Sequence, residues 1–172
     1  TLLNVGEKIK DRLPFDVINI SPKELRWKNI YRLNPFSAFV YSGYYQSKTI
    51  QNSVSECVKR KDYDLIYCHS STAMINCPNF DIPVIGHLID LFSVAYLSYK
   101  ETSTSILAGI YYWKESLLAS RFESQLANKF CRILLVNKDE VEIANKTYKT
   151  DSFLFQPHGV KISNKPLKDE KN

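Results

Sequence analysis

The chain has 172 residues, of which 44% are hydrophobic, 24% are charged and 13% are aromatic. This length and composition suit one globular domain whose core needs neither disulfides nor metal, and they exclude an intrinsically disordered chain. The formal net charge of +5 is modest. It is compatible with phosphate-bearing ligands or an anionic membrane surface, but it favours a solvated basic face, and no nucleic acid is expected as a partner.

Four cysteines occur without a C-x-x-C pair or a spacing typical of a metal site: Cys57, Cys68, Cys77 and Cys131. Two of them, Cys68 and Cys131, lie in or beside apolar runs, where a reduced cysteine behaves as a small hydrophobe. This usage favours a reducing, cytoplasmic compartment over a disulfide-bonded scaffold. No apolar run approaches the ~20 residues that a membrane-spanning helix needs, so we expect a soluble protein or, at most, a peripheral membrane protein.

The amino-terminal part of the chain is predicted to contain two strands and an interrupted helix. Residues 1–5 read as a strand, residues 15–20 alternate apolar and polar side chains, and residues 22–33 have a broken helical pattern. A further helix is predicted to run through Ile50, Val54 and Cys57. It is expected to end at the basic residues 59–61, whose cations complement the negative end of the helix dipole.

Two compact apolar runs, residues 63–70 and 83–90, are predicted to be neighbouring buried strands. The first ends in a polar tip and is followed by a loop at residues 70–72, and the second ends in Asp90. The short connection between them fits a right-handed βαβ unit. Because open α/β sheets bind ligands at the carboxyl ends of their strands, these two ends are the first candidates for a functional site.

After Asp90 the pattern becomes helical. Apolar residues recur at four-residue spacing in a stripe that Ile110 and Leu117 are expected to extend: Leu118, Phe122, Leu126 and Phe130. A buried strand is predicted at residues 132–136. Asn137 is predicted to cap the next helix, with Glu140 as its capping-box partner. A last short strand covers residues 152–155, and residues 165–172 form a charged tail.

The alternation of apolar strands and helices predicts an α/β fold with a doubly wound, Rossmann-like parallel sheet. The sequence contains no internal repeat. No G-x-G-x-x-G or P-loop motif occurs among the 5 glycines, which disfavours a self-contained nucleotide-binding domain.

Four stretches, in this order, resemble motifs in the amino-terminal domain of family-4 glycosyltransferases of GT-B architecture. They are the strand at 63–69, the strand at 83–90, the helix with Arg121-Phe122-Glu123 and the segment 133–140 after it, and the stretch Pro157-His158-Gly159-Val160. The resemblance is greatest to bacterial sugar transferases of exopolysaccharide clusters, which have a D-l-v-D-x-x-S pattern where this chain has residues 87–93. It covers roughly residues 62–160.

The resemblance implies half of a two-domain enzyme. Residues 1–162 would form the acceptor-side domain, and residues 163–172 a charged tail or the start of an interdomain linker. A second domain, not contained in these 172 residues, would bind the nucleotide-sugar donor, so the chain alone is not expected to transfer sugar. The acceptor would be a glycan or a lipid-linked glycan of a surface polysaccharide. The resemblance implies neither a cofactor nor a metal ion, and no Asp-x-Asp motif occurs in the sequence.

Asp90 is the predicted catalytic residue, because a carboxylate at the end of a strand can take a proton from an acceptor hydroxyl. The alternative is that it caps the helix beginning near Leu91. Four residues are predicted to bind the acceptor: His69, Ser70, His87 and Ser93. For His69 and Ser70 the alternative is a turn, and for His87 it is a core histidine with satisfied hydrogen bonds.

The resemblance also implies that His158 and Gly159 lie near the donor, and that Glu123 fixes local structure rather than contacting substrate. The chain departs from the family pattern at Ile89, where a catalytic histidine is common, and at Asn137 and His158, which replace Ser and Asn. The missing histidine predicts either impaired catalysis or greater dependence on Asp90.

Two functions other than a two-domain transferase fit the sequence. One is a stand-alone flavodoxin-like binding or regulatory module, and the other is one subunit of a split glycosyltransferase. The cluster Tyr111-Tyr112-Trp113 is expected to pack in the core. The alternative is peripheral contact with the inner face of a membrane, since Lys100 and Lys114 lie beside these aromatic side chains.

Overall fold

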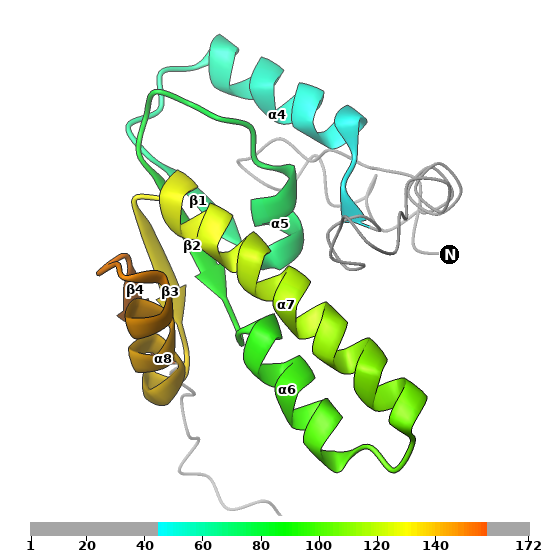
Figure 1. Ribbon diagram of the computed structural model, residues 1–172. Helices are drawn as coiled ribbons and strands as arrows, with labels where there is room; N and C mark the ends of the chain where they lie inside the picture. Colours follow the sequence, from blue (N-terminus) through cyan, green and yellow to red (C-terminus); the bar gives the residue numbers. More distant parts are fainter. Residues whose placement is uncertain (1–44, 158–172) are drawn as a thin grey trace, which may run out of the picture.

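The computed structural model describes residues 45–157 (Figure 1). The elements in chain order are α4 (Lys48–Arg60), β1 (Ile66–His69), α5 (Ser71–Asn76), β2 (Val84–Leu88), α6 (Phe92–Thr102), α7 (Ile106–Lys129), β3 (Arg132–Leu135), α8 (Lys138–Tyr148) and β4 (Phe153–Phe155). The elements predicted before residue 45, the predicted donor-side residues His158 and Gly159, and the charged tail lie outside the described residues.

The four strands form one sheet in the order β1-β2-β3-β4, and every neighbouring pair is parallel. Each strand is joined to the next through helix, as the predicted βαβ pattern requires. This confirms the α/β class and is consistent with the predicted Rossmann-like, doubly wound fold. All four strands therefore end at the same edge of the sheet.

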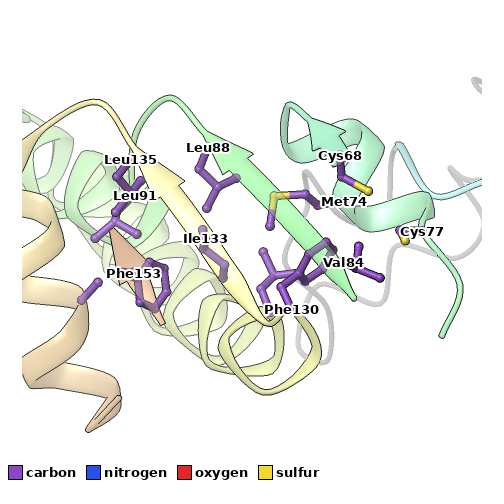
Figure 2. Close-up of a cluster of buried hydrophobic side chains, with 12 residues drawn as sticks. Cys68, Met74, Cys77, Val84, Leu88, Leu91, Phe130, Ile133, Leu135 and Phe153 are labelled. Atoms are coloured by element: carbon purple, nitrogen blue, oxygen red, sulfur yellow. The ribbon is translucent and has the colours of Figure 1, made fainter. Parts of the chain in front are cut away.

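One face of the sheet carries the main core. The strand side chains on this face alternate with outward ones and include Cys68, Val84, Leu88, Ile133, Leu135 and Phe153. Met74 of α5, Leu126 of α7 and Ala144 of α8 belong to the same buried cluster, so these three helices cover this face; Figure 2 shows the cluster. Gly86 lies between Cys68 and Ile133 in register, where a larger side chain would meet Met74.

The other face is lined by the alternate residues of the same strands. Tyr67, His69 and Leu154 on this face are exposed and Leu134 is half-buried, whereas His87 is buried. Within residues 45–157, this face therefore has much more accessible side-chain surface than the helix-covered face.

Helices α6 and α7 pack against each other as a hairpin that extends away from the sheet (Figure 1). The break at residues 103–105 divides the region that the sequence predicted to be helical throughout. Leu118 and Leu126 are buried, in agreement with the predicted stripe. Ile110 and Leu117, expected to extend this stripe, are instead exposed, because the 100° turn per residue places them on the opposite side of α7.

Side-chain caps and an amide fix several helix starts. Ser47 accepts a hydrogen bond from the Ile50 backbone N–H at the start of α4, and Asn137 accepts one from Asp139 at the start of α8. The predicted loop at residues 70–72 is shorter than expected, because Ser71 and Thr72 already belong to α5. Buried Asn76 then ties α5 to the start of α4 by accepting from the Ser47 N–H at 2.7 Å.

Among the described residues, no helix is long and apolar enough to cross a bilayer.

Candidate functional site

The carboxyl edge of the sheet brings together most of the residues predicted to form the site. His69 ends β1, Ser70 follows it, and His87 is the register partner of His69 on β2. Asp90 follows two residues after the end of β2 and is exposed. Parallel pairing thus places a hydroxyl, two imidazoles and a carboxylate along one edge.

His69 and His87 are in direct contact. Their Nδ1 atoms lie 3.2 Å apart, and the ring centroids lie 5.0 Å apart in an edge-on arrangement. The Tyr67 hydroxyl lies 2.7 Å from the same Nδ1 of His87. Tyr67 was not among the predicted residues, although its spacing of two from His69 would place both on one face of a strand.

Tyr67 and His69 compete for one nitrogen atom, the Nδ1 of His87. An imidazole nitrogen carries either one proton or one lone pair, so the Nδ1 of His87 makes one strong hydrogen bond at a time. This nitrogen can therefore make a strong hydrogen bond with either Tyr67 or His69, but not with both at the same time. An incoming hydroxyl that bonded to His69 would release His87 to pair with Tyr67. This arrangement is suited to exchanging hydrogen bonds with a polar ligand.

Ser70 turns the chain sharply between β1 and α5. Its φ of 81° and ψ of 153° are costly for a residue with a Cβ atom. The conformation is held because the Ser70 N–H donates to the His87 carbonyl at 3.0 Å and the Ser70 carbonyl accepts from the Met74 N–H at 3.1 Å. Strained non-glycine residues of this kind concentrate at functional sites.

Asp90 lies in a turn that is stabilised by a buried glutamate of another element, Glu140 of α8. The Leu91 N–H, directly after Asp90, donates to Oε2 of Glu140 at 2.7 Å. Helix α6 begins at Phe92 with Leu91 as its N-cap, and the N-cap residue itself makes no side-chain capping hydrogen bond. The alternative role of Asp90 as the cap of this helix is therefore not observed, and its carboxylate stays at the surface.

Ser93 is turned away from the edge and toward Glu123 of α7. Its hydroxyl donates to Oε2 of Glu123 at 2.5 Å, and its backbone N–H donates to Oε1 at 3.1 Å. The Tyr148 hydroxyl donates to Oε2 of the same carboxylate at 2.6 Å. The Ser93 hydroxyl is thus used within the fold. Glu123 fixes the start of α6, the role that the resemblance implied.

Burial dominates the electrostatics of both glutamates. Desolvation raises the pKa of Glu123, and the hydrogen bonds from Ser93 and Tyr148 oppose this rise. Desolvation likewise raises the pKa of Glu140, the Leu91 N–H opposes it, and the negative charge of Asp90 adds to it. Burial and the Glu123 carboxylate together raise the pKa of Tyr148 to about 12. Tyr148 therefore stays a hydrogen-bond donor at neutral pH.

An apolar pocket of about 430 Å³ adjoins this edge between α4, β1 and α5. Tyr67 and Ser70 line it together with Ile50, Val54 and Ala73. A larger pocket, of about 590 Å³, lies at the opposite end of the strands, where Pro83 and Cys131 line it. Because it borders the amino ends of β2 and β3, it contains none of the predicted site residues.

The side chains that usually bind metal ions do not cluster in the described part of the chain. Among residues 45–157 there is no group of three or more His, Cys, Asp or Glu side chains that could hold a metal ion.

Comparison of the chain with protein-family models, with curated proteins and with solved structures finds no match.

Proposed function

We propose that this chain is the acceptor-side domain of a sugar transferase of the GT-B type. The single observation that supports this most is the convergence of His69, His87 and Asp90 at the carboxyl edge of a parallel sheet. Ligands of open α/β sheets bind at this edge. The chemistry of the edge, imidazoles beside an exposed carboxylate, matches the hydrogen-bonding needs of a sugar hydroxyl.

In this proposal the acceptor hydroxyl oxygen bonds to the anomeric carbon of the donor sugar, the bond from that carbon to the phosphate oxygen of the nucleotide breaks, and the nucleotide leaves. Asp90 receives the proton of the acceptor hydroxyl or accepts its hydrogen bond. Glu140 acts as a positioning residue, because it holds the Leu91 N–H and so fixes the turn that presents Asp90. His69 contacts the acceptor from the neighbouring strand, and His87, which is 95% buried, supports it through the shared Nδ1 contact. Ile89, where the family commonly has histidine, is exposed beside them.

The donor nucleotide-sugar would be bound by a second domain, on the same polypeptide or on a separate subunit. His158 and Gly159, the predicted donor-side residues, would contribute to binding the donor. The product would be a surface polysaccharide precursor made in the cytoplasm from a glycan or lipid-linked acceptor. Such a reaction requires no cofactor from the residues of this edge.

The test is transfer of labelled sugar by the complete enzyme, with the donor domain present, using wild type and Asp90→Asn. Loss of a general base lowers the rate by about 10²–10⁴-fold, and the variant should keep its thermal stability because Asp90 is exposed. Asp81→Asn is the matched control, since Asp81 is also exposed but precedes β2 at the opposite end of the strands.

An unchanged rate in Asp90→Asn would remove Asp90 from the mechanism. If neither variant nor wild type transfers sugar from any nucleotide-sugar tested with the donor domain present, the transferase proposal fails. Binding of a small ligand by the 172-residue chain would then favour the stand-alone module.

A further inference from the structure

The α6–α7 hairpin carries an unusual amount of exposed apolar surface. Of the large hydrophobic side chains that are exposed in residues 45–157, eight lie on this hairpin: Leu97, Tyr99, Ile106, Leu107, Ile110, Tyr111, Trp113 and Leu117. The hairpin also extends away from the sheet (Figure 1). Exposed apolar side chains that gather on one part of a molecule mark a binding surface. We infer that the end of this hairpin docks the protein on a lipid bilayer by inserting into its interface.

The outermost turn of α7 is the most apolar part. Ile106 and Leu107 are 83% and 80% exposed, although they are among the most hydrophobic side chains of the chain. The connection before them, Ser103-Thr104-Ser105, is polar but uncharged. The nearest charged side chains are Lys100 and Glu101 at the end of α6, so the connection and the first turn of α7 can enter the interface without moving a charge of their own out of water.

Aromatic side chains follow behind this apolar end. Tyr99, Tyr111 and Tyr112 are in mutual contact, with ring centroids 5.7 Å apart for Tyr99 and Tyr112 and 5.5 Å apart for Tyr111 and Tyr112. Trp113 is half-exposed beside them. At about 1.5 Å per residue, Trp113 lies ~10 Å along the axis from Ile106. Interfacial helices bury their apolar groups ~5–10 Å deep, so the aromatics would lie at headgroup level.

The charges of the hairpin suit this depth. Lys100 lies in the last turn of α6, and Lys114 lies with its amine 5.5 Å from the centre of the Tyr111 ring. Glu115 is fully buried and pairs with Lys114 at 3.0 Å. Between residues 92 and 117, Glu101 is therefore the only exposed carboxylate. Lys114 is thus engaged within the protein, whereas the exposed Lys100 can reach the phosphate groups while its methylene stem stays in the apolar layer.

A partner helix is the main competing occupant. Ile106, Ile110, Trp113 and Leu117 follow one another at spacings of four, three and four, which also suits a helix–helix seam. Leu107 and Tyr111, however, lie about 100–140° around α7 from Ile106 and are exposed as well. The apolar surface at the start of α7 is thus wider than a single seam. A bilayer can cover all of this surface, whereas one helix covers only a strip of it.

The test is co-sedimentation of the purified 172-residue chain with vesicles of phosphatidylcholine and of an equal mixture of phosphatidylcholine and phosphatidylglycerol. The wild type should bind both. The double substitution Ile106→Ser and Leu107→Ser should lower the partition coefficient by about tenfold or more, because two large apolar groups no longer leave water. Lys100→Gln should lower binding only to the anionic mixture, by roughly fivefold.

The matched control is Leu65→Ser with Ile143→Ser, since both residues are exposed but lie on other parts of the fold. Circular dichroism checks that each variant is folded. The inference fails if the wild type does not bind vesicles, or if the control loses as much binding as the hairpin variant. It also fails if the chain is a dimer in solution that Ile106→Ser and Leu107→Ser dissociate, since a second copy would then cover the surface. These measurements need no sugar donor, so their outcome is separate from that of the proposed transferase activity.

Discussion

Ser93 and Glu123 lie 30 residues apart in the sequence, yet Glu123 accepts both the backbone N–H and the hydroxyl of Ser93, at 3.1 and 2.5 Å. The same carboxylate accepts from the Tyr148 hydroxyl. One buried side chain of α7 thereby joins the start of α6 to the end of α8. The turn that carries Asp90 depends on this junction and on Glu140 beside it.

Replacement of Glu123 by alanine is therefore expected to destabilise the protein strongly. Three donors would lose their acceptor in the interior, and each unsatisfied group costs about 1–3 kcal/mol. We expect the free energy of unfolding to fall by about 3 kcal/mol or more, measured by urea denaturation. Glu142→Ala on the exposed side of α8 should change it by less than about 0.5 kcal/mol. Equal losses in the two variants would contradict the role given to Glu123.

The raised pKa of Glu123 also predicts a pH effect on stability. Folding raises this pKa above its ordinary value of 4.5, so the folded state holds the proton to a higher pH than the unfolded state. The resulting stability is fully present below the unfolded pKa and is lost as the pH rises through the folded pKa. Between those two values, the wild type should lose stability with rising pH relative to Glu123→Gln. Melting temperatures of both proteins at a series of pH values test this, and parallel curves would refute it.

Gly86 should not tolerate a side chain while Met74 is present. A Cβ atom at position 86 would lie 2.2 Å from Cε and 2.8 Å from Sδ of Met74, and 3.2 Å from the Phe130 ring. We expect Gly86→Ala to cost about 1–3 kcal/mol of unfolding free energy.

The contact partly involves the flexible end of Met74, so shortening that side chain should relieve it. The loss caused by Gly86→Ala should be smaller in a Met74→Ala background than in the wild type, as a double-mutant cycle by urea denaturation would measure. If the two losses are equal, Phe130 or the backbone is the true obstacle.

Ser70 offers the reverse case, in which glycine should stabilise. Its φ of 81° is unfavourable for serine and free for glycine. Because such strain costs about 1–3 kcal/mol and glycine loses about 0.5–1 kcal/mol in entropy, Ser70→Gly should be neutral or stabilising by roughly 1 kcal/mol. Ser98→Gly inside α6 is the control and should be destabilising. Thermal unfolding of both variants decides the matter, and a clear loss at position 70 would argue against strain there.

Much of the fold could be predicted because strand and helix signals are local. The runs at residues 63–70, 83–90 and 132–136 each contain an observed strand, and Asn137 caps α8 as expected. Parallel strands between helices then follow from chain connectivity. Glu140, by contrast, was predicted to serve only its own helix, but it accepts from Leu91 on a distant turn. No local pattern encodes that pairing.

The site shows the same division. The sequence by itself determined that His69, Ser70, His87 and Asp90 would be near the ends of two neighbouring strands, because those residues follow the apolar runs directly. Only the tertiary structure decided that Tyr67 and His69 both meet one nitrogen of His87, and that Ser93 faces Glu123. Periodicity identifies which residues share a side of a helix or strand, but strand register and the packing of one helix on another determine which side is buried and which side chains meet.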